Sequence, residues 1–232
     1  MTRTAAVFFD VDFTLIHPGP RFQSSGYRES CARHGIIVDE GRFDEACVQA
    51  EAVLDDSAET YDAGLYIAFT RRIIEAMGGT GPALDRVSRE IYDEWAEHAH
   101  FSLYDDVADA LRELRARGVR LGLISNSHRC LVSFQSHFEL DGLIDVAVSS
   151  SDYGVLKPHS PIFQRALSLM DVRADEAAMV GDSVPHDVNG ARRIGMRPIL
   201  IVRDGSAPVV EDDVTVVRSL AELPELVAPA RD

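Results

Sequence analysis

Lysine, cysteine and long apolar runs are all scarce in this sequence. Of its 23 basic residues, 22 are arginine and only Lys157 is lysine. The three cysteines, Cys31, Cys47 and Cys130, are too few and too scattered for a disulfide framework or a cysteine-rich metal site. We therefore predict free thiols and a cytoplasmic location, where thiols stay reduced. The apolar run Ala5–Phe9 is too short for a signal-peptide core or a membrane span.

Positive charge is also in short supply, because 38 acidic residues outnumber 23 basic ones and leave a formal net charge of −15. Nucleic acids and anionic membranes are polyanions, so this balance argues against both as partners. Apolar residues, in contrast, make up 46% of the 232 residues. This content suits a folded chain with one large domain, or with a domain that carries a smaller insert.

Five short apolar runs, rich in valine and isoleucine, alternate little with polar residues. That pattern is typical of strands buried on both faces of a parallel sheet. The runs are Ala5–Val11, Val119–Ile124, Asp145–Val148, Ala177–Val180 and Pro198–Val202. Helical patterns lie between the later runs, over 105–117, from Ser160 onward and over 185–194. The alternation predicts an α/β fold with a doubly wound, mostly parallel, Rossmann-like sheet.

The stretch from His17 to Ala99 has no convincing strand and shows four helical periodicities instead. They cover Phe22–His34, Glu40–Leu54, Tyr61–Met77 and Pro82–Ala96. We therefore predict an α/β catalytic core of residues 1–16 and 100–232. A small all-helical cap domain, residues 17–99, would interrupt this core after its first strand.

Polar side chains follow the predicted strands where each one ends, and in a parallel sheet these ends share the edge where ligands bind. They are Asp10, Asp12 and Thr14 after the first run, Ser125 and Asn126 after the second, Lys157 after the third, and Asp182 and Asp187 after the fourth. Each of these residues alone is typical of a helix N-cap, a turn or the solvated surface. Together, crowded carboxylates favour a bound Mg²⁺ ion, while the lysine, hydroxyls and backbone N–H groups suit a phosphate.

Four short motifs carry a family resemblance. The first is the Asp-x-Asp-x-Thr pattern in Phe8–Leu15, and the second is Ile124-Ser125-Asn126. The third is Lys157-Pro158, and the fourth is Gly181-Asp182-Ser183 with Asp187. In these motifs the sequence resembles the haloacid dehalogenase-like hydrolase superfamily, in the phosphatase branch with a helical cap after the first strand. The resemblance spans the α/β core and predicts the cap by its position.

The resemblance implies a catalytic role for three residues. Asp10 would be the nucleophile and would form an aspartyl-phosphate. Asp12 would be the general acid for the leaving oxygen and then the general base for water. Lys157 would orient Asp10 and neutralise phosphate charge. A Mg²⁺ cofactor would be held by Asp10, the Asp12 carbonyl and Asp182, with Asp187 behind them or bridged through water.

The same resemblance assigns phosphate binding to Thr14, Ser125 and the Asn126 amide. It implies a Mg²⁺-dependent phosphomonoester hydrolase that acts on a small phosphorylated metabolite. One departure is Phe13, at a position where the family very often has glycine. The large side chain removes no catalytic group, but it would narrow the entrance or alter how the cap closes. The sequence does not indicate an oligomeric state.

Three alternatives stay open, and a fourth is nearly excluded. A 2-haloacid dehalogenase lacks a carboxylate two residues after its nucleophile, so Asp12 favours a phosphatase. A phosphomutase differs mainly in how it keeps water out. A non-catalytic phosphate-binding α/β module is the third alternative, although such modules lack a long helical insertion. A phosphonate hydrolase needs a cap lysine, and residues 17–99 contain none.

Overall fold

A computed structural model of the protein describes residues 4–54, 58–205 and 208–228. The chain divides into two compact units, one formed by Met1–His17 with Leu103–Asp232 and the other by Pro18–Ser102. The first unit is built around a sheet, and the second is mainly helical. That the second unit works as a cap stays a prediction.

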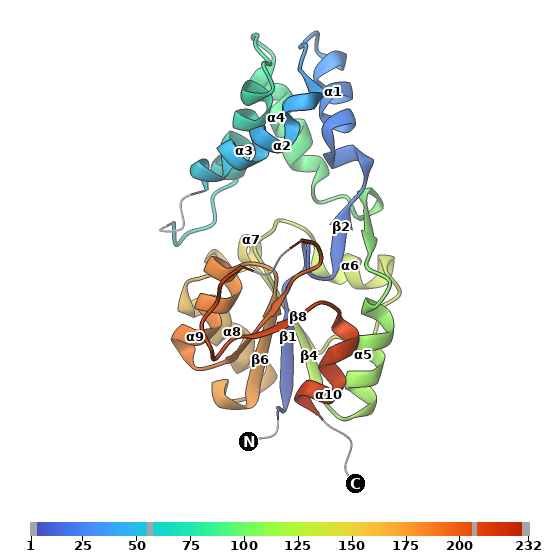
Figure 1. The fold of residues 1–232 in the computed structure, drawn as a ribbon, viewed down its shortest axis with the longest axis vertical. Coiled ribbons are helices and arrows are strands. Elements are labelled where there is room, and N and C mark those ends of the chain that lie inside the picture. Colours follow the sequence, from blue (N-terminus) through green and yellow to red (C-terminus); the bar gives the residue numbers. More distant parts are fainter. Residues whose placement is uncertain (1–3, 55–57, 206–207, 229–232) are drawn as a thin grey trace. The chain divides into compact units, whose positions relative to one another are not determined.

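The sheet unit holds six strands in the order β5-β4-β1-β6-β7-β8. Their bounds are β1 Ala6–Phe9, β4 Arg120–Ser125, β5 Val146–Ser149, β6 Ala177–Gly181, β7 Arg197–Ile201 and β8 Thr215–Val217. All neighbouring pairs run parallel. The predicted doubly wound parallel sheet is therefore confirmed (Figure 1). Strand β8 was not among the predicted strands, and its three residues are too few to form a recognisable pattern.

Strand β1 lies in the middle of this sheet, and its position decides where the polar residues gather. It pairs with β4 on one side and with β6 on the other, so that Phe9 is in register with both Leu123 and Val180. The residues that follow these three strands therefore emerge at the same edge. This is the edge at which the sequence predicts a site.

Helices cover both faces of the sheet. They are α5 Val107–Ala116, α6 Leu131–His137, α7 Ser150–Tyr153, α8 Ser160–Met170, α9 Asn189–Ile194 and α10 Leu223–Val227. Short 3-10 turns η5 Ala174–Glu176 and η7 Leu220–Glu222, and the π-helical turn η6 Val184–Val188, complete the connections. Helices α8 and α9 lie on one side of the sheet, and α5 and α10 lie on the other (Figure 1).

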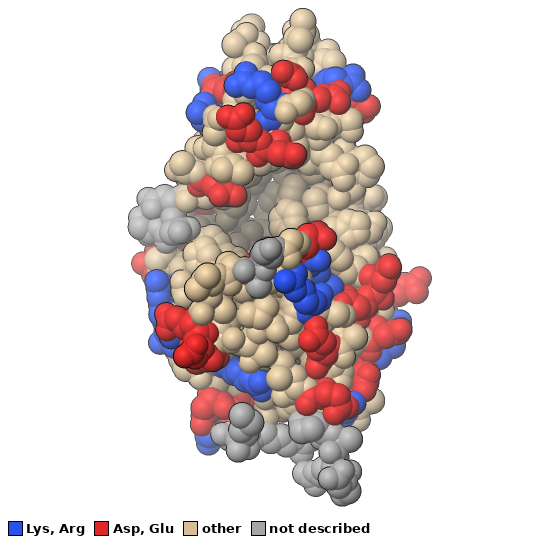
Figure 2. Space-filling model, viewed as in Figure 1, with Lys and Arg blue, Asp and Glu red and all other residues tan. Residues whose placement is uncertain are grey.

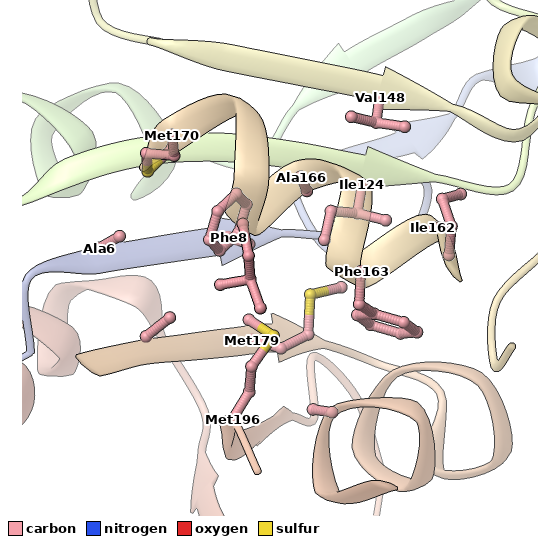
Figure 3. Close-up of a cluster of buried hydrophobic side chains, with 13 residues drawn as sticks. Ala6, Phe8, Ile124, Val148, Ile162, Phe163, Ala166, Met170, Met179 and Met196 are labelled. Carbon is pink, nitrogen blue, oxygen red and sulfur yellow. The ribbon is translucent and has the colours of Figure 1, made fainter. Parts of the chain in front are cut away.

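The core beneath α8 is an apolar cluster that joins the central strands to the helices. Phe8 of β1, Met179 of β6 and Phe163 of α8 all point into it (Figure 3). A Cβ on Gly190 would lie 2.4 Å from the Phe163 ring, so a side chain at this position would force α9 away from α8. Burial of such large side chains contributes about 1.5–3 kcal/mol each.

The helical unit contains α1 Ser24–Arg33, α2 Phe43–Ala50, α3 Ala63–Ala76 and α4 Leu84–Glu94. The four lie within the four predicted helical ranges. Short 3-10 turns connect or flank them: η1 Pro20–Phe22, η2 Glu40–Arg42, η3 Glu51–Val53 and η4 His98–His100. Trp95 packs against Phe22 with ring centroids 4.5 Å apart. Two further strands, β2 Ile16–Pro18 and β3 Phe101–Leu103, form a separate two-stranded sheet.

Acidic and basic side chains are interspersed on the face of the sheet unit that Figure 2 shows. Many surface arginines pair with carboxylates, as Arg192 does with Asp213 at 3.0 Å and Arg173 with Asp175 at 2.8 Å. Cys31, Cys47 and Cys130 are free thiols. Within the described ranges, no helix combines the length and the apolar character needed to cross a membrane.

We expect Gly122→Ala to destabilise the sheet unit by about 1–3 kcal/mol, because overpacking a buried site has this cost. The new Cβ would lie 2.5 Å from Cδ1 of Phe8 and 2.9 Å from Cε of Met170. Urea unfolding measures the difference. Adding Phe8→Leu to Gly122→Ala should recover part of the lost stability, because it removes the ring that the new Cβ meets. Equal stabilities of wild type and Gly122→Ala would contradict close packing of Gly122 against Phe8.

Candidate active site

Asp10 is the first residue after β1 and is held in place from two sides. Its backbone N–H donates to the Val180 carbonyl of β6 at 2.9 Å. Its carboxylate accepts a hydrogen bond at Oδ1 from Lys157 Nζ at 2.5 Å, and the residue is 7% exposed. The aspartate predicted as the nucleophile therefore lies buried at the edge of the sheet, with one oxygen fixed by the chain's single lysine.

Lys157 joins two of the predicted carboxylates. Its Nζ donates to Asp187 Oδ1 at 2.7 Å as well as to Asp10, and Lys157 is 3% exposed. Burial by itself would lower the pKa of Lys157, but the charges of Asp10 and Asp187 raise it by more. Lys157 is thus a fixed positive charge between two carboxylates at any ordinary pH.

Asp187 is fixed by three neighbours. Lys157 donates to Oδ1, and the Ser183 backbone N–H donates to Oδ2 at 3.1 Å. A Cβ on Gly181 would lie 2.1 Å from Oδ2, so only glycine at this position lets the carboxylate approach the end of β6. Burial, the main cause, and the charge of Asp10 raise the pKa of Asp187 to about 6 against the lowering effect of Lys157.

Asp182 completes a cluster with Asp10 and Asp187, in which one carboxylate oxygen from each lies within 4.8 Å of the others. Asp182 is exposed to solvent, whereas Asp10 and Asp187 are buried. The atoms around its carboxylate desolvate it, and the charges of Asp10 and Asp187 repel it, so its pKa is raised to about 8. The Thr14 hydroxyl lies between Asp10 Oδ2 and Asp182 Oδ1, at 3.4 Å from each.

These three aspartates fit a divalent cation. Carboxylate oxygens are the hard ligands that Mg²⁺ prefers, and Mg²⁺ needs only a few of them because it retains water. Lys157 contacts Asp10 and Asp187, and its charge lowers the pKa of Asp182 by less than burial and the two neighbouring carboxylates raise it. A cation beside Asp182 would offset the repulsion that Asp10 and Asp187 exert on its carboxylate. The donor set and its excess negative charge therefore both suit Mg²⁺.

Asn126 and Ser125 lie at the end of β4. The Asn126 side chain binds the backbone of Lys157 at both ends, since Nδ2 donates to the Lys157 carbonyl at 2.9 Å and Oδ1 accepts from its N–H at 2.8 Å. Both polar atoms of the Asn126 side chain are thus engaged, and that Asn126 binds phosphate stays a prediction. Ser125 is buried, and its hydroxyl donates to the Ser127 hydroxyl at 3.0 Å.

Asp12 pairs with a residue that the motifs did not indicate. Arg129 Nη2 donates to Asp12 Oδ1 at 2.9 Å, and the Arg129 side chain is 0% exposed. Burial raises the pKa of Asp12, the Arg129 charge opposes the rise, and the Asp10 charge adds to it, with the net direction upward. Asp12 thus stands apart from the three clustered carboxylates and has its own cation.

A tight turn carries the chain from Asp10 to Thr14. The N–H groups of Leu15 and Ile16 both donate to the Val11 carbonyl, and Phe13 N–H donates to the Ile16 carbonyl at 2.7 Å. Phe13 has φ 61°, a left-handed conformation that is strained for a bulky residue and free of strain for glycine. This explains physically why glycine suits the position. The Phe13 ring is 45% exposed.

Three residues of the site lie outside the sequence prediction. Arg203 Nη2 donates to the Thr14 carbonyl at 2.6 Å while Nη1 binds Asp106 at 2.8 Å, and this fixes the turn that carries Thr14. Arg129 donates to Asp12, and Gly181 leaves room for the carboxylate of Asp187. Gly181 belongs to the Gly181-Asp182-Ser183 motif. No local pattern distinguishes Arg129 or Arg203 from the other 20 arginines.

A comparison with family models matches residues 4–195 to a haloacid dehalogenase-like hydrolase. Human haloacid dehalogenase-like hydrolase domain-containing protein 3 is 30% identical over 238 residues, which cover 97% of this chain and 92% of the human protein. Glyceraldehyde 3-phosphate phosphatase of Methanothermobacter thermautotrophicus is 27% identical over 237 residues, covering 95% of this chain and 98% of that enzyme.

Solved structures share the fold. A haloacid dehalogenase-type hydrolase from Bacillus subtilis, solved bound to magnesium, superposes with a TM-score of 0.75. The match covers 97% of this chain and 99% of that protein, at 17% identity. At this identity the likeness supports the α/β fold alone.

We expect Mg²⁺ to stabilise the protein more at about pH 8 than at about pH 5, because protons compete for the same oxygens. A carboxyl group with a raised pKa favours the folded state at low pH, and this contribution is lost as the pH rises. For Asp187 and Asp182 that loss is complete above their pKa values of about 6 and about 8. Thermal melts in EDTA and in Mg²⁺ at both pH values measure the difference.

Asp182→Asn is the matched variant for these melts. It should remove most of the stabilisation by Mg²⁺ and flatten the pH dependence in EDTA. Asp175→Asn, at an exposed carboxylate before β6, should change neither. A Mg²⁺ effect of equal size at both pH values would contradict the competition between protons and the cation.

Proposed function

This chain belongs to the haloacid dehalogenase-like hydrolases, and we propose that it is a Mg²⁺-dependent phosphomonoester hydrolase that works through an aspartyl-phosphate. This family membership confirms the resemblance found in the four sequence motifs, and it confirms the prediction of a hydrolase. The observation that carries the phosphatase proposal is the buried Lys157 between Asp10 and Asp187, with Asp182 and Thr14 beside them. This arrangement gives a fixed nucleophile next to a place for a phosphoryl group.

In the first proposed step, a carboxylate oxygen of Asp10 attacks the phosphorus of the ester. The bond between phosphorus and the leaving oxygen breaks, and Asp12 gives that oxygen its proton, so that an alcohol leaves. Lys157 keeps Asp10 aimed through its contact at 2.5 Å and offsets the phosphate charge. Thr14, Ser125 and the Asn126 N–H would hold the other phosphoryl oxygens.

In the second step, a water molecule attacks the phosphorus of the aspartyl-phosphate. Asp12, now a carboxylate, takes a proton from this water, and the bond from phosphorus to the Asp10 oxygen breaks. Inorganic phosphate leaves, and Asp10 is a free carboxylate again. Asp12 therefore ends the cycle with the proton that it needs for the next substrate.

Asp10, the Asp12 carbonyl and Asp182 would hold Mg²⁺, with Asp187 behind them. When bound, the cation supplies positive charge to the phosphoryl oxygens. Asp187 would hold Lys157 in place. The Ser183 N–H donates to its carboxylate, and Gly181 leaves the space that brings this carboxylate close to Lys157. The buried carboxylates, which would repel one another at neutral pH, explain why the chain needs a cation there.

A small phosphorylated metabolite is the proposed substrate class. The glyceraldehyde 3-phosphate phosphatase relative is named for such a compound. Residues 17–99 of this chain contain 16 acidic and 8 basic residues, and a negatively charged cap would not attract polyanions. A 2-haloacid dehalogenase activity is the weaker alternative, because Asp12 is present and has its own ion pair with Arg129.

Hydrolysis of p-nitrophenyl phosphate tests the proposal. We expect release of p-nitrophenolate that needs Mg²⁺ and disappears in Asp10→Asn, because the amide cannot act as the nucleophile. Asp175→Asn changes an exposed carboxylate at the other end of β6 and should keep full activity. No release from this compound or from a broad panel of metabolite phosphates would overturn the proposal.

We expect Lys157→Arg to lower kcat/KM by about 10²-fold, the loss typical of a removed group that stabilises transition-state charge. A forked guanidinium does not fit a space that holds an ammonium between two carboxylates at 2.5 and 2.7 Å. Steady-state kinetics on the same ester measure the loss. The control is Arg165→Lys on the exposed side of α8, which makes the reverse exchange. Near-normal turnover of Lys157→Arg would count against the assigned role.

A further inference from the structure

Arg129 is a charged side chain in a place where charge is costly. It lies in the loop between β4 and α6, is 1% exposed, and is the largest of the fully buried side chains in the described ranges. A buried guanidinium that loses its partner costs several kcal/mol, whereas an apolar side chain of similar volume often costs nothing. The presence of arginine here therefore needs a reason beyond packing.

The partner of Arg129 supplies that reason. Its Nη2 donates to Asp12 Oδ1 at 2.9 Å, and the Asp12 side chain is 17% exposed while that of Arg129 is 0% exposed. The arginine is thus closed off from solvent and from any substrate, and the aspartate still reaches the site. Its contact with Asp12 gives Arg129 a route to the reaction that needs no contact with substrate.

Asp12 has the one proposed role that changes during the cycle. It gives a proton in the first step and takes one in the second, so its carboxyl group must keep one orientation in both forms. A guanidinium remains charged throughout and presents its donors in a rigid plane. A hydrogen bond from this plane to Oδ1 restricts rotation of the whole carboxyl group.

We propose that Arg129 is a positioning residue that holds Asp12 in line for both proton transfers, an inference that rests on the proposed phosphatase function. In the first step Asp12 loses its proton to the leaving oxygen, and Arg129 neutralises the carboxylate that forms. In the second step Arg129 keeps that carboxylate aimed at the attacking water, from which it takes the proton back. No other reactant is needed.

The two steps can be separated with p-nitrophenyl phosphate. The p-nitrophenolate ion is a stable anion and leaves without a proton, so the first step with this ester does not need Asp12 as an acid. Asp12 then releases its unused proton to solvent, and the second step still needs it as a base. A defect in positioning Asp12 should therefore slow only the second step with p-nitrophenyl phosphate, and both steps with glycerol phosphate, whose leaving alcohol requires a proton.

The variant is Arg129→Met, which keeps an unbranched apolar stem, though a shorter one, and removes the charge. We expect the burst of p-nitrophenolate to stay within about threefold of wild type, while the steady-state rate falls about 10²-fold, the usual size of a lost acid–base contribution. Phosphorylated protein should accumulate and be visible in the intact mass as one added phosphoryl group. Asp12→Asn should give the same pattern, and adding Arg129→Met to it should change little more.

Arg129→Lys is the second variant in case the methionine protein does not fold, because it keeps a cation near Asp12. In Arg129→Lys the burst should again stay near that of wild type, and the steady-state rate should fall by less than in Arg129→Met. Arg165→Met, on the exposed side of α8, is the matched control and should leave both rates unchanged. A folded Arg129 variant with both rates normal, or with both lowered equally, would overturn the positioning role.

Failure of this inference differs from failure of the proposed function. If Asp10→Asn is inactive and wild type forms a phosphoenzyme, the function stands, and the Arg129 variants alone decide the inference. If wild type forms no phosphoenzyme and releases no phosphate, the proposed function is wrong, and the positioning role is wrong with it.

Discussion

Repulsion among carboxylates is the constraint on which the site depends. Asp10, Asp182 and Asp187 come within 4.8 Å of one another, and two of the three are buried. A cation between them offsets this repulsion, and Lys157 provides one at 2.5 Å from Asp10 and 2.7 Å from Asp187. The neighbouring features serve that contact: Asn126 fixes the Lys157 backbone at both ends, and Gly181 makes room for Asp187.

The acidic residues fall into two groups with separate cations. Asp10 and Asp187 pair with Lys157, and Asp12 pairs with Arg129. Each carboxylate thereby acquires a different environment, although Asp10 and Asp12 are only two residues apart. Such a difference is what a nucleophile and a proton carrier require, because the first must stay ionised and the second must exchange a proton.

The sequence was sufficient for the parallel sheet and for the clustering of Asp10, Lys157, Asp182 and Asp187, because strand ends in a parallel sheet share an edge. It was not sufficient for contacts set by packing. Arg129 and Arg203 act through neighbours 117 and 189 residues away in the chain, and nothing local distinguishes them from surface arginines. The strain at Phe13 depends on a backbone angle that composition does not reveal.

The scarcity of lysine has a further consequence for chemistry performed on the protein. Lys157 is the only ε-amine in 232 residues and is 3% exposed. An amine-directed reagent therefore has one internal target, and two carboxylates hold that target protonated. Acylation of Lys157 requires the site to open and the ammonium to lose its proton. Its rate would report how often this edge of the sheet becomes accessible, without any label being engineered into the chain.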